Sequence, residues 1–253
     1  MGFRIRAVQK EVGSLHRSSS CTRSGIKLFR HSGYTYDGIL LNRPRVLIAD
    51  DHRMVAEGLK RLLDPEFELV GVVEDGMALI AAAKKLQPDV IIADIAMPRL
   101  NGLDALAQVK KECPGVKIVM LTMHREAAYA QRALDAGASA FVLKHCAPEE
   151  LIAAIRAALA GKTYITPVVT GELLQRMRQD PRAAKDPVTA LTPRQREILQ
   201  LFAEGRSAKE IADILSISAR TAGFHKYKMM EVLGLQNNTD LTRFAIKHGI
   251  VAA

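Results

Sequence analysis

The sequence predicts an α/β domain built on a doubly wound parallel sheet, followed by a second, smaller all-α domain. Strand-like and helix-like stretches alternate five times over residues 44–162, and short, capped helical stretches fill residues 191–253. Between them, residues 163–190 hold one helical stretch and then prolines among small residues, which predicts a linker with one helix. A chain of 253 residues is long enough for two domains that each bury a core.

The predicted sheet comes from five short apolar runs, each followed by a helical stretch. Such alternation is typical of βαβ units, in which right-handed crossovers place helices on both faces of a parallel sheet. The strand-like runs are Val46–Ala49, Phe67–Val73, Asp89–Ala93, Lys117–Leu121 and Ala140–Leu143. The helix-like stretches are Val55–Leu63, Gly76–Leu86, Leu103–Glu112, Glu126–Ala136 and Pro148–Ala160.

Polar side chains follow four of these strands, at the point where each strand ends. If these strands are neighbours, their carboxyl ends bring the side chains into one pocket. Close carboxylates raise one another's pKa unless a cation intervenes, and Mg²⁺ prefers such oxygen ligands. An Asp94 carboxylate could then accept a phosphoryl group, whose oxygens Thr122 and Lys144 would contact. The converging residues are Asp50 and Asp51, Asp94, Thr122 and Lys144, after the first, third, fourth and fifth strands.

This constellation resembles the receiver domain of two-component response regulators. The match includes Met97-Pro98 and Gly102, which follow the third strand, besides the polar residues at the strand ends. The resemblance implies a flavodoxin-like five-stranded sheet of order 2-1-3-4-5. It also implies that Asp94 is the phosphoacceptor and that a histidine kinase is the partner that phosphorylates it.

The same resemblance implies a Mg²⁺ site and a switch. Asp51, Asp94 and the backbone carbonyl of Ala96 would hold the ion, while Asp50 would assist through water. Three histidines also follow these strand ends; loop residues exposed to solvent and transition-metal ligands both remain open for them. They are His52, His124 and His145. The implied switch pair is Thr122 and Phe141.

The C-terminal block predicts four short helices with defined starts. Capping boxes begin the first two helices at Thr192 and Ser207, and Ser218 and Asn237 cap the next two. Two short helices joined by a tight turn, the second carrying basic residues, are typical of a helix-turn-helix; a helical protein-interaction module remains the alternative. The predicted DNA contacts are Arg220, Thr221, His225, Lys226 and Lys228.

This block resembles the LuxR-type DNA-binding domain, and the whole chain resembles response regulators of the NarL/FixJ type. The resemblance implies that the third helix enters the major groove and that the phosphorylated protein is a homodimer. The third helix departs from the family at Ala219, Ala222 and Gly223, and glycine inside a helix costs about 1 kcal/mol relative to alanine. The matching residues are Leu191 to Glu197, Glu204-Gly205, Lys209 to Ala212, Ile217-Ser218, Thr221, Phe224-His225 and Leu233 to Leu235.

Two alternative functions depend on single features. A phosphatase of the haloacid dehalogenase type needs a second Asp two residues after its nucleophile, where this chain has Ala96, so the sequence predicts no enzyme. A phosphorylation-independent regulator that acts through DNA or protein contacts remains open, because the third helix of the C-terminal domain is altered. Either way, the fold alone does not decide the function.

The net charge of +9 is concentrated at the two ends of the chain. Residues 1–43 hold eight Lys and Arg against two acidic residues, and residues 191–253 hold nine against six. The first excess predicts a basic, disordered N-terminal extension, and the second is compatible with nucleic-acid binding. There is no apolar run long enough for a membrane span. The three separated cysteines, Cys21, Cys113 and Cys146, favour free thiols in a cytoplasmic protein.

Overall fold

The computed structural model describes residues 43–178 and 187–251. The predicted N-terminal extension lies outside the described residues, except for Arg43. Residues 179–186 of the predicted linker also lie outside them. In the two described ranges, no helix is both long and apolar enough to pass through a bilayer.

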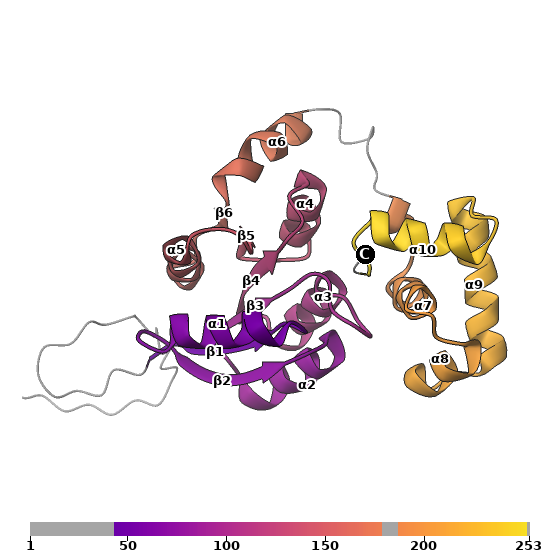
Figure 1. The fold of residues 1–253 in the computed structure, drawn as a ribbon, viewed down its shortest axis with the longest axis horizontal. Helices are drawn as coiled ribbons and strands as arrows, with labels where there is room; N and C mark the ends of the chain where they lie inside the picture. The colour runs from indigo at the N-terminus through magenta and orange to yellow at the C-terminus, as the bar shows by residue number, and fades with distance from the viewer. Residues whose placement is uncertain (1–42, 179–186, 252–253) are drawn as a thin grey trace, which may run out of the picture. The chain divides into compact units, whose positions relative to one another are not determined.

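A parallel sheet of six strands, in the order β2-β1-β3-β4-β5-β6, forms the centre of the first domain (Figure 1). The predicted order of the first five strands is confirmed, and every neighbouring pair is parallel. Strands β1 and β3 align residue for residue, from Val46 with Val90 to Ala49 with Ala93. The first five strands are β1 Arg45–Ala49, β2 Glu68–Val73, β3 Val90–Ala93, β4 Lys117–Thr122 and β5 Ala140–Leu143.

Helices cover both faces of this sheet, so the four inner strands β1, β3, β4 and β5 are buried on two sides. Alternate residues of one strand enter different cores: Leu47 packs with α2, α3 and α4, whereas Ile48 packs with α1 and α5. This explains why the strands are continuous apolar runs rather than alternating ones. The covering helices are α1 Arg53–Leu63, α2 Gly76–Leu86, α3 Gly102–Glu112, α4 Ala127–Asp135 and α5 Pro148–Leu159.

The sheet also has a strand that the sequence analysis did not predict. Strand β6, Tyr164–Ile165, pairs with β5, and α6, Pro167–Arg178, packs on α4. Thr166 lies buried between β6 and α6 and anchors them to α5 and β5. Its hydroxyl donates a hydrogen bond to Glu150 Oε1 at 2.7 Å and accepts one from the Leu143 N–H at 3.3 Å. The stretch that was expected to begin a linker therefore completes the α/β domain.

The second domain is a set of short helices around its own core. Both predicted capping boxes are confirmed, at Thr192 and at Ser207, and Ser218 and Asn237 cap the next two helices. Ser216, with a φ of 53°, ends α8 in a left-handed turn. The elements are a 3₁₀ turn Pro187–Ala190, α7 Pro193–Ala203, α8 Ala208–Leu215, α9 Ala219–Leu233 and α10 Asn238–Lys247.

Candidate functional site

The polar residues predicted at the strand ends meet at one edge of the sheet. Asp50 follows β1, Asp94 follows β3, Thr122 ends β4 and Lys144 follows β5. Because these four strands are neighbours, the residues emerge beside one another. Asp50 and Asp94 are 2% and 4% exposed, whereas the side chain of Asp51 is partly open to solvent. We call Asp50, Asp51, Asp94 and Lys144 the acidic cluster.

Lys144 lies between the two buried carboxylates of this cluster. Its Nζ is 2.7 Å from Asp94 Oδ2 and 2.8 Å from Asp50 Oδ2. Burial raises the pKa of the Asp94 carboxyl above its usual value, although Lys144 offsets part of the rise. Burial lowers the pKa of Lys144, but Asp94 and Asp50 more than offset this and raise it, so the amine stays protonated. The carboxylates still outnumber this one ammonium group, which favours a further cation.

The backbone fixes the position of Asp94. Its Oδ1 accepts a hydrogen bond from the Ile95 N–H at 2.6 Å and a longer one from the Ala96 N–H at 3.4 Å. Gly102 donates its N–H to the Ile95 carbonyl oxygen at 2.8 Å, and a Cβ at Gly102 would overlap the Asp94 carbonyl oxygen. The close approach of this loop to the strand end therefore requires glycine at position 102.

The acidic cluster fits a divalent metal ion. Asp50, Asp51, His52 and Asp94 each offer one ligand atom, and these atoms lie within 4.8 Å of one another. Carboxylate oxygens are the ligands that Mg²⁺ prefers. For His52 the sequence left both a solvent-exposed loop position and a metal-ligand role open, and its Nδ1 lies 2.9 Å from Asp51 Oδ1. Its position directly after Asp51, where the loop turns into α1, brings it to this group.

The two residues of the predicted switch pair are both fully buried. Thr122 lies at the end of β4, where its Oγ1 accepts a hydrogen bond from the His124 N–H at 3.2 Å. Phe141 lies in β5, in the core formed with α4. Of the other predicted histidines, His124 stacks on Tyr129 with ring centroids 4.4 Å apart, and His145 is exposed. Neither His124 nor His145 belongs to the metal-ligating group in the part of the chain that is described.

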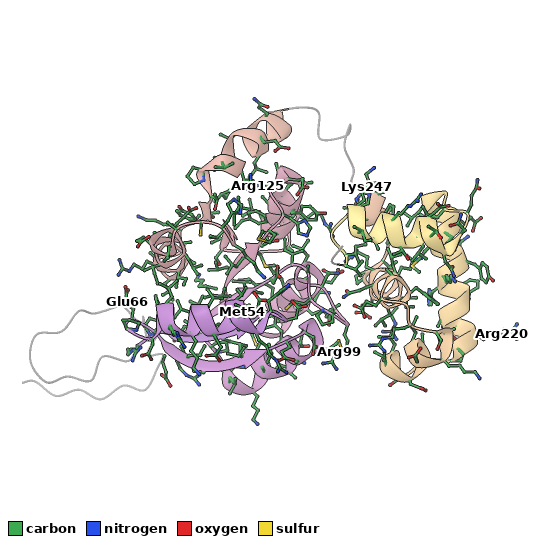
Figure 2. The ribbon with its side chains drawn as sticks, in the orientation of Figure 1. Met54, Glu66, Arg99, Arg125, Arg220 and Lys247 are labelled. Atoms are coloured by element: carbon green, nitrogen blue, oxygen red, sulfur yellow. The ribbon has the colours of Figure 1, made fainter. Side chains whose placement is uncertain are left out.

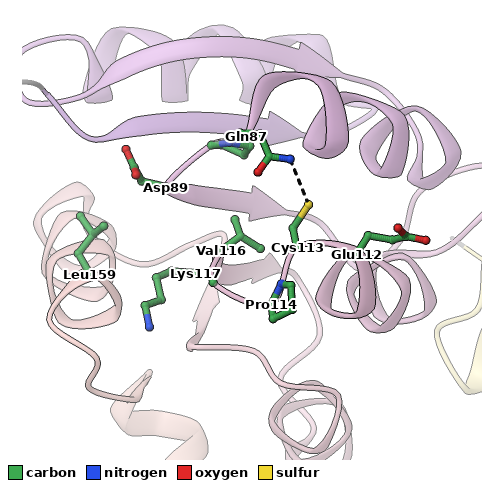
Figure 3. Close-up of a pocket in the computed structure, with 10 residues that line it drawn as sticks. Gln87, Asp89, Glu112, Cys113, Pro114, Val116, Lys117 and Leu159 are labelled. Atoms are coloured by element: carbon green, nitrogen blue, oxygen red, sulfur yellow. Dashed lines mark hydrogen bonds between the residues drawn. The ribbon is translucent and has the colours of Figure 1, made fainter. Parts of the chain in front are cut away.

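A hollow at the opposite edge of the sheet has a different character (Figure 3). It lies at the starts of β3 and β4, and Gln87 Nε2 donates a weak hydrogen bond to Cys113 Sγ at 3.7 Å. Burial lowers the pKa of the nearby Lys110, and Lys117 lowers it further. The residues of the acidic cluster do not line this hollow. The converging carboxylates therefore mark the other edge as the functional one.

The predicted DNA contacts all lie on α9, but they point in different directions. Arg220 is exposed and extends outward from the helix (Figure 2). Lys226 is half-buried, with its Nζ 4.8 Å from the ring centroid of Phe202 in α7. Lys228 is exposed and pairs with Glu231 at 2.9 Å. The remaining two, Thr221 and His225, are half-buried.

Comparisons with known proteins identify both domains. Residues 46–156 match the response regulator receiver domain, and residues 189–245 match the luxR family of bacterial regulatory proteins. The transcriptional regulatory protein MctR of Rhizobium johnstonii is 35% identical over 210 residues, which cover 82% of this chain and 95% of MctR. The chain belongs to the response regulators. This response regulator thus combines a receiver domain with a LuxR-type DNA-binding domain, as predicted.

Other relatives agree with this assignment. The oxygen regulatory protein NreC of Staphylococcus carnosus is 35% identical, over 80% of this response regulator and 97% of NreC. A structure of RcsB from Salmonella typhimurium has 32% identity and a TM-score of 0.57, over 80% and 96% of the two chains. Another, of RcsB from Salmonella enterica serovar Typhimurium bound to the rprA promoter with the phosphomimetic BeF₃⁻, has 32% identity and a TM-score of 0.54, over 79% and 98%. The family comprises transcriptional response regulators rather than enzymes, which sets the phosphatase alternative aside.

Proposed function

We propose that this response regulator controls transcription by accepting a phosphoryl group on Asp94 from a histidine kinase. The observation that carries the proposal is the placement of the Asp94 and Asp50 carboxylates at 2.7 and 2.8 Å from Lys144 Nζ. In the transfer, an Asp94 oxygen forms a bond to phosphorus while the bond from phosphorus to the kinase histidine nitrogen breaks. Lys144 then pairs with one phosphoryl oxygen, and the Thr122 hydroxyl donates a hydrogen bond to another.

The oxygen ligands of the acidic cluster support Mg²⁺ as the cofactor. Asp51, Asp94 and the Ala96 carbonyl would hold the ion, and Asp50 would assist through water. When bound, Mg²⁺ supplies positive charge that neutralises the phosphoryl oxygens. The roles of the protein's own residues are to hold the nucleophile through the Ile95 N–H and to keep a protonated amine beside it.

Phosphorylation would then act on DNA binding. In this proposal Thr122 and Phe141 rearrange when Asp94 is phosphorylated, and two copies pair on DNA in the cytoplasm. Pairing is supported by a structure of two RcsB dimers bound to two parallel DNAs. Pairing raises affinity because two half-sites are engaged together. The sequence-based boundaries of 44–162, 163–190 and 191–253 are adjusted in this proposal. The receiver extends to residue 178, because β6 pairs with β5 and α6 packs on α4. The DNA-binding domain begins at residue 187, because Val188 lies in its core. The proposed DNA contacts are Arg220, Thr221, His225, Lys226 and Lys228.

Phosphoryl transfer to Asp94 can be tested directly. The full chain is incubated with acetyl phosphate and Mg²⁺, and the acyl phosphate is detected as a shift in phosphate-affinity electrophoresis. We expect a shift in the wild type and in Asp135→Asn, a control that neutralises an exposed carboxylate on α4, and none in Asp94→Asn. A shift that persists in Asp94→Asn would place the phosphate on another residue. Footprinting on genomic fragments with and without beryllofluoride tests the link to DNA; equal protection in both would contradict the switch.

A further inference from the structure

The surface of α9 that faces solvent carries two aromatic side chains. Arg220, Phe224 and Lys228 follow one another at spacings of four residues, Tyr227 lies three residues after Phe224, and all four are exposed. We call these four residues the outward face. Phe224 is 64% exposed and Tyr227 is 76% exposed. In the part of the chain that the structure describes, they are the only two aromatic side chains among the large exposed hydrophobic ones.

Isolated exposed apolar residues are ordinary on a protein surface and need no special explanation. Here, however, two rings occupy successive turns of one helix, and that helix is the second of a helix-turn-helix pair. In this motif, the second helix presents its outer residues to the edges of the bases in the major groove. The rings therefore lie where sequence would be read.

Two of the basic residues of α9 already have partners within the domain. Lys226 lies toward α7, with its ammonium group over the ring of Phe202. Arg220 is one turn before Phe224, and the ammonium group of Lys228 pairs with Glu231 one turn later. Base edges are read by hydrogen bonds and by apolar contacts, and the exposed rings of Phe224 and Tyr227 can supply the apolar ones.

Gly223 supports the same interpretation. It precedes Phe224, and with Tyr227 and Lys226 it lines a hollow between α7, α9 and α10. A Cβ at position 223 would meet no atom within 4 Å, so packing inside the domain does not require glycine there. Its backbone has an ordinary helical φ, which any residue could adopt. The missing side chain leaves room beside the two rings for the close approach of another molecule.

We infer that Phe224 and Tyr227 read the target sequence through apolar contacts with the 5-methyl groups of thymine. The methyl group is the apolar feature that distinguishes thymine in the major groove, and an aromatic edge is a suitable partner for it. The Tyr227 hydroxyl adds a donor for a base acceptor at the same edge. This inference rests on the proposed function and assigns base reading to residues outside the set of basic contacts. It follows that these contacts contribute specificity with little dependence on salt, since they release no counterions.

The test begins with selection from a random 30-bp duplex library, using the full chain with Mg²⁺ and beryllofluoride. The variants are Phe224→Ala, Tyr227→Phe and, as a matched control, Val232→Ala, which trims another exposed apolar side chain of α9. We expect wild type and Val232→Ala to select the same motif, and Phe224→Ala to lose preference at its thymine positions. Tyr227→Phe, which keeps the ring, should retain the preference for thymine. Because Phe224 is exposed, helicity and thermal unfolding of its variant should match those of the wild type.

Substitution within the selected duplex tests the methyl group itself. Replacing one contacted thymine by deoxyuracil removes only that methyl group and should weaken wild-type binding about fourfold, as expected for a buried methylene-sized group. The same duplex change should leave binding by Phe224→Ala unchanged, and the slope of affinity against salt should be equal for both proteins. If Phe224→Ala selects the wild-type motif with wild-type affinity, the inference is overturned. If it instead loses self-association with its motif unchanged, the surface belongs to a second copy. If the wild type selects no motif at all, the proposed DNA binding fails, which is a separate result.

Discussion

The acidic cluster of the receiver and the outward face of α9 are the two surfaces to which we assign functions, and they differ in how firmly the chain holds them. In the cluster, Asp50, Asp94 and Lys144 are buried and bonded to one another, and backbone N–H groups hold the Asp94 carboxylate. On α9, Phe224 and Tyr227 stand in solvent on a helix with a glycine beside them. Chemistry on a phosphoryl group needs fixed geometry, whereas sequence reading tolerates change in side chains that are mostly exposed.

The largest expected effect comes from removing the buried cation of the acidic cluster. Lys144→Met keeps most of the side-chain volume but leaves the Asp94 and Asp50 carboxylates without their ammonium partner. Breaking a buried pair from one side costs about 3–5 kcal/mol, so the free energy of unfolding in EDTA should fall by that amount. Urea denaturation measures it, and Mg²⁺ should restore part of the loss. Arg220→Met, which removes an exposed cation of α9, is the matched control and should change stability little; equal effects in both variants would contradict the comparison.

The next effect tests the close approach behind Asp94. In Gly102→Ala, the new Cβ overlaps the Asp94 carbonyl oxygen, and the loop must move away from the strand end. Overpacking of this kind costs about 1–3 kcal/mol, and the displaced carboxylate should also react more slowly with acetyl phosphate. Gly115→Ala is the control, because a Cβ there meets nothing within 4 Å. If the two variants unfold and react alike, the glycine at position 102 is not required for the reason given.

Both of these substitutions lie in the receiver domain, the part of the protein whose structure could best be predicted from the sequence. The five β/α repeats and the residues at the strand ends could be predicted because burial on both faces leaves continuous apolar runs, and parallel strands share one carboxyl edge. The helix caps of the second domain could be predicted because capping is local, as at Thr192 and Ser207.

Other features depended on contacts that the sequence does not display. Strand β6 is two residues long and shows no periodicity; its neighbour Thr166 is held by a hydrogen bond to Glu150, sixteen residues earlier. On α9, the predicted DNA contacts were chosen by charge, and this choice included Lys226. Lys226 lies four residues after the buried Ala222 and three before the buried Met229, which places it on the inner side of the helix. Helical position is therefore a better guide than charge to which residues face outward.

A smaller effect than the loss of Lys144 is expected from Asp94 itself, because Lys144 offsets part of the cost of burying the carboxylate. The pKa of Asp94 is raised on folding, chiefly by burial, so the folded protein holds this proton more tightly than the unfolded chain. The stabilising contribution of the protonated form is present below the usual pKa of an aspartic acid side chain and is lost as the pH rises through the higher pKa of the folded state. In EDTA at pH 7, Asp94→Asn should therefore unfold at a higher temperature than wild type, and the difference should shrink toward pH 4. Thermal melts between pH 4 and pH 7 measure this difference in unfolding temperature. A wild type that is more stable than Asp94→Asn at pH 7 would contradict the prediction.

The smallest effect is expected at Gly223, beside the outward face, where a substitution should raise stability, unlike those at Lys144 and Gly102. Gly223→Ala adds a Cβ into open space on an ordinary helical backbone, so it should stabilise the DNA-binding domain by about 1 kcal/mol. Gly205→Ala is the control: that glycine has a φ of +83°, where a side chain is strained, and its substitution should destabilise the same domain. Urea denaturation followed by helicity compares them. A destabilised Gly223→Ala would show that the helix packs more tightly there than its surface indicates. A stabilised variant with weaker binding to its selected duplex would show that position 223 is glycine because another molecule approaches the helix at that point.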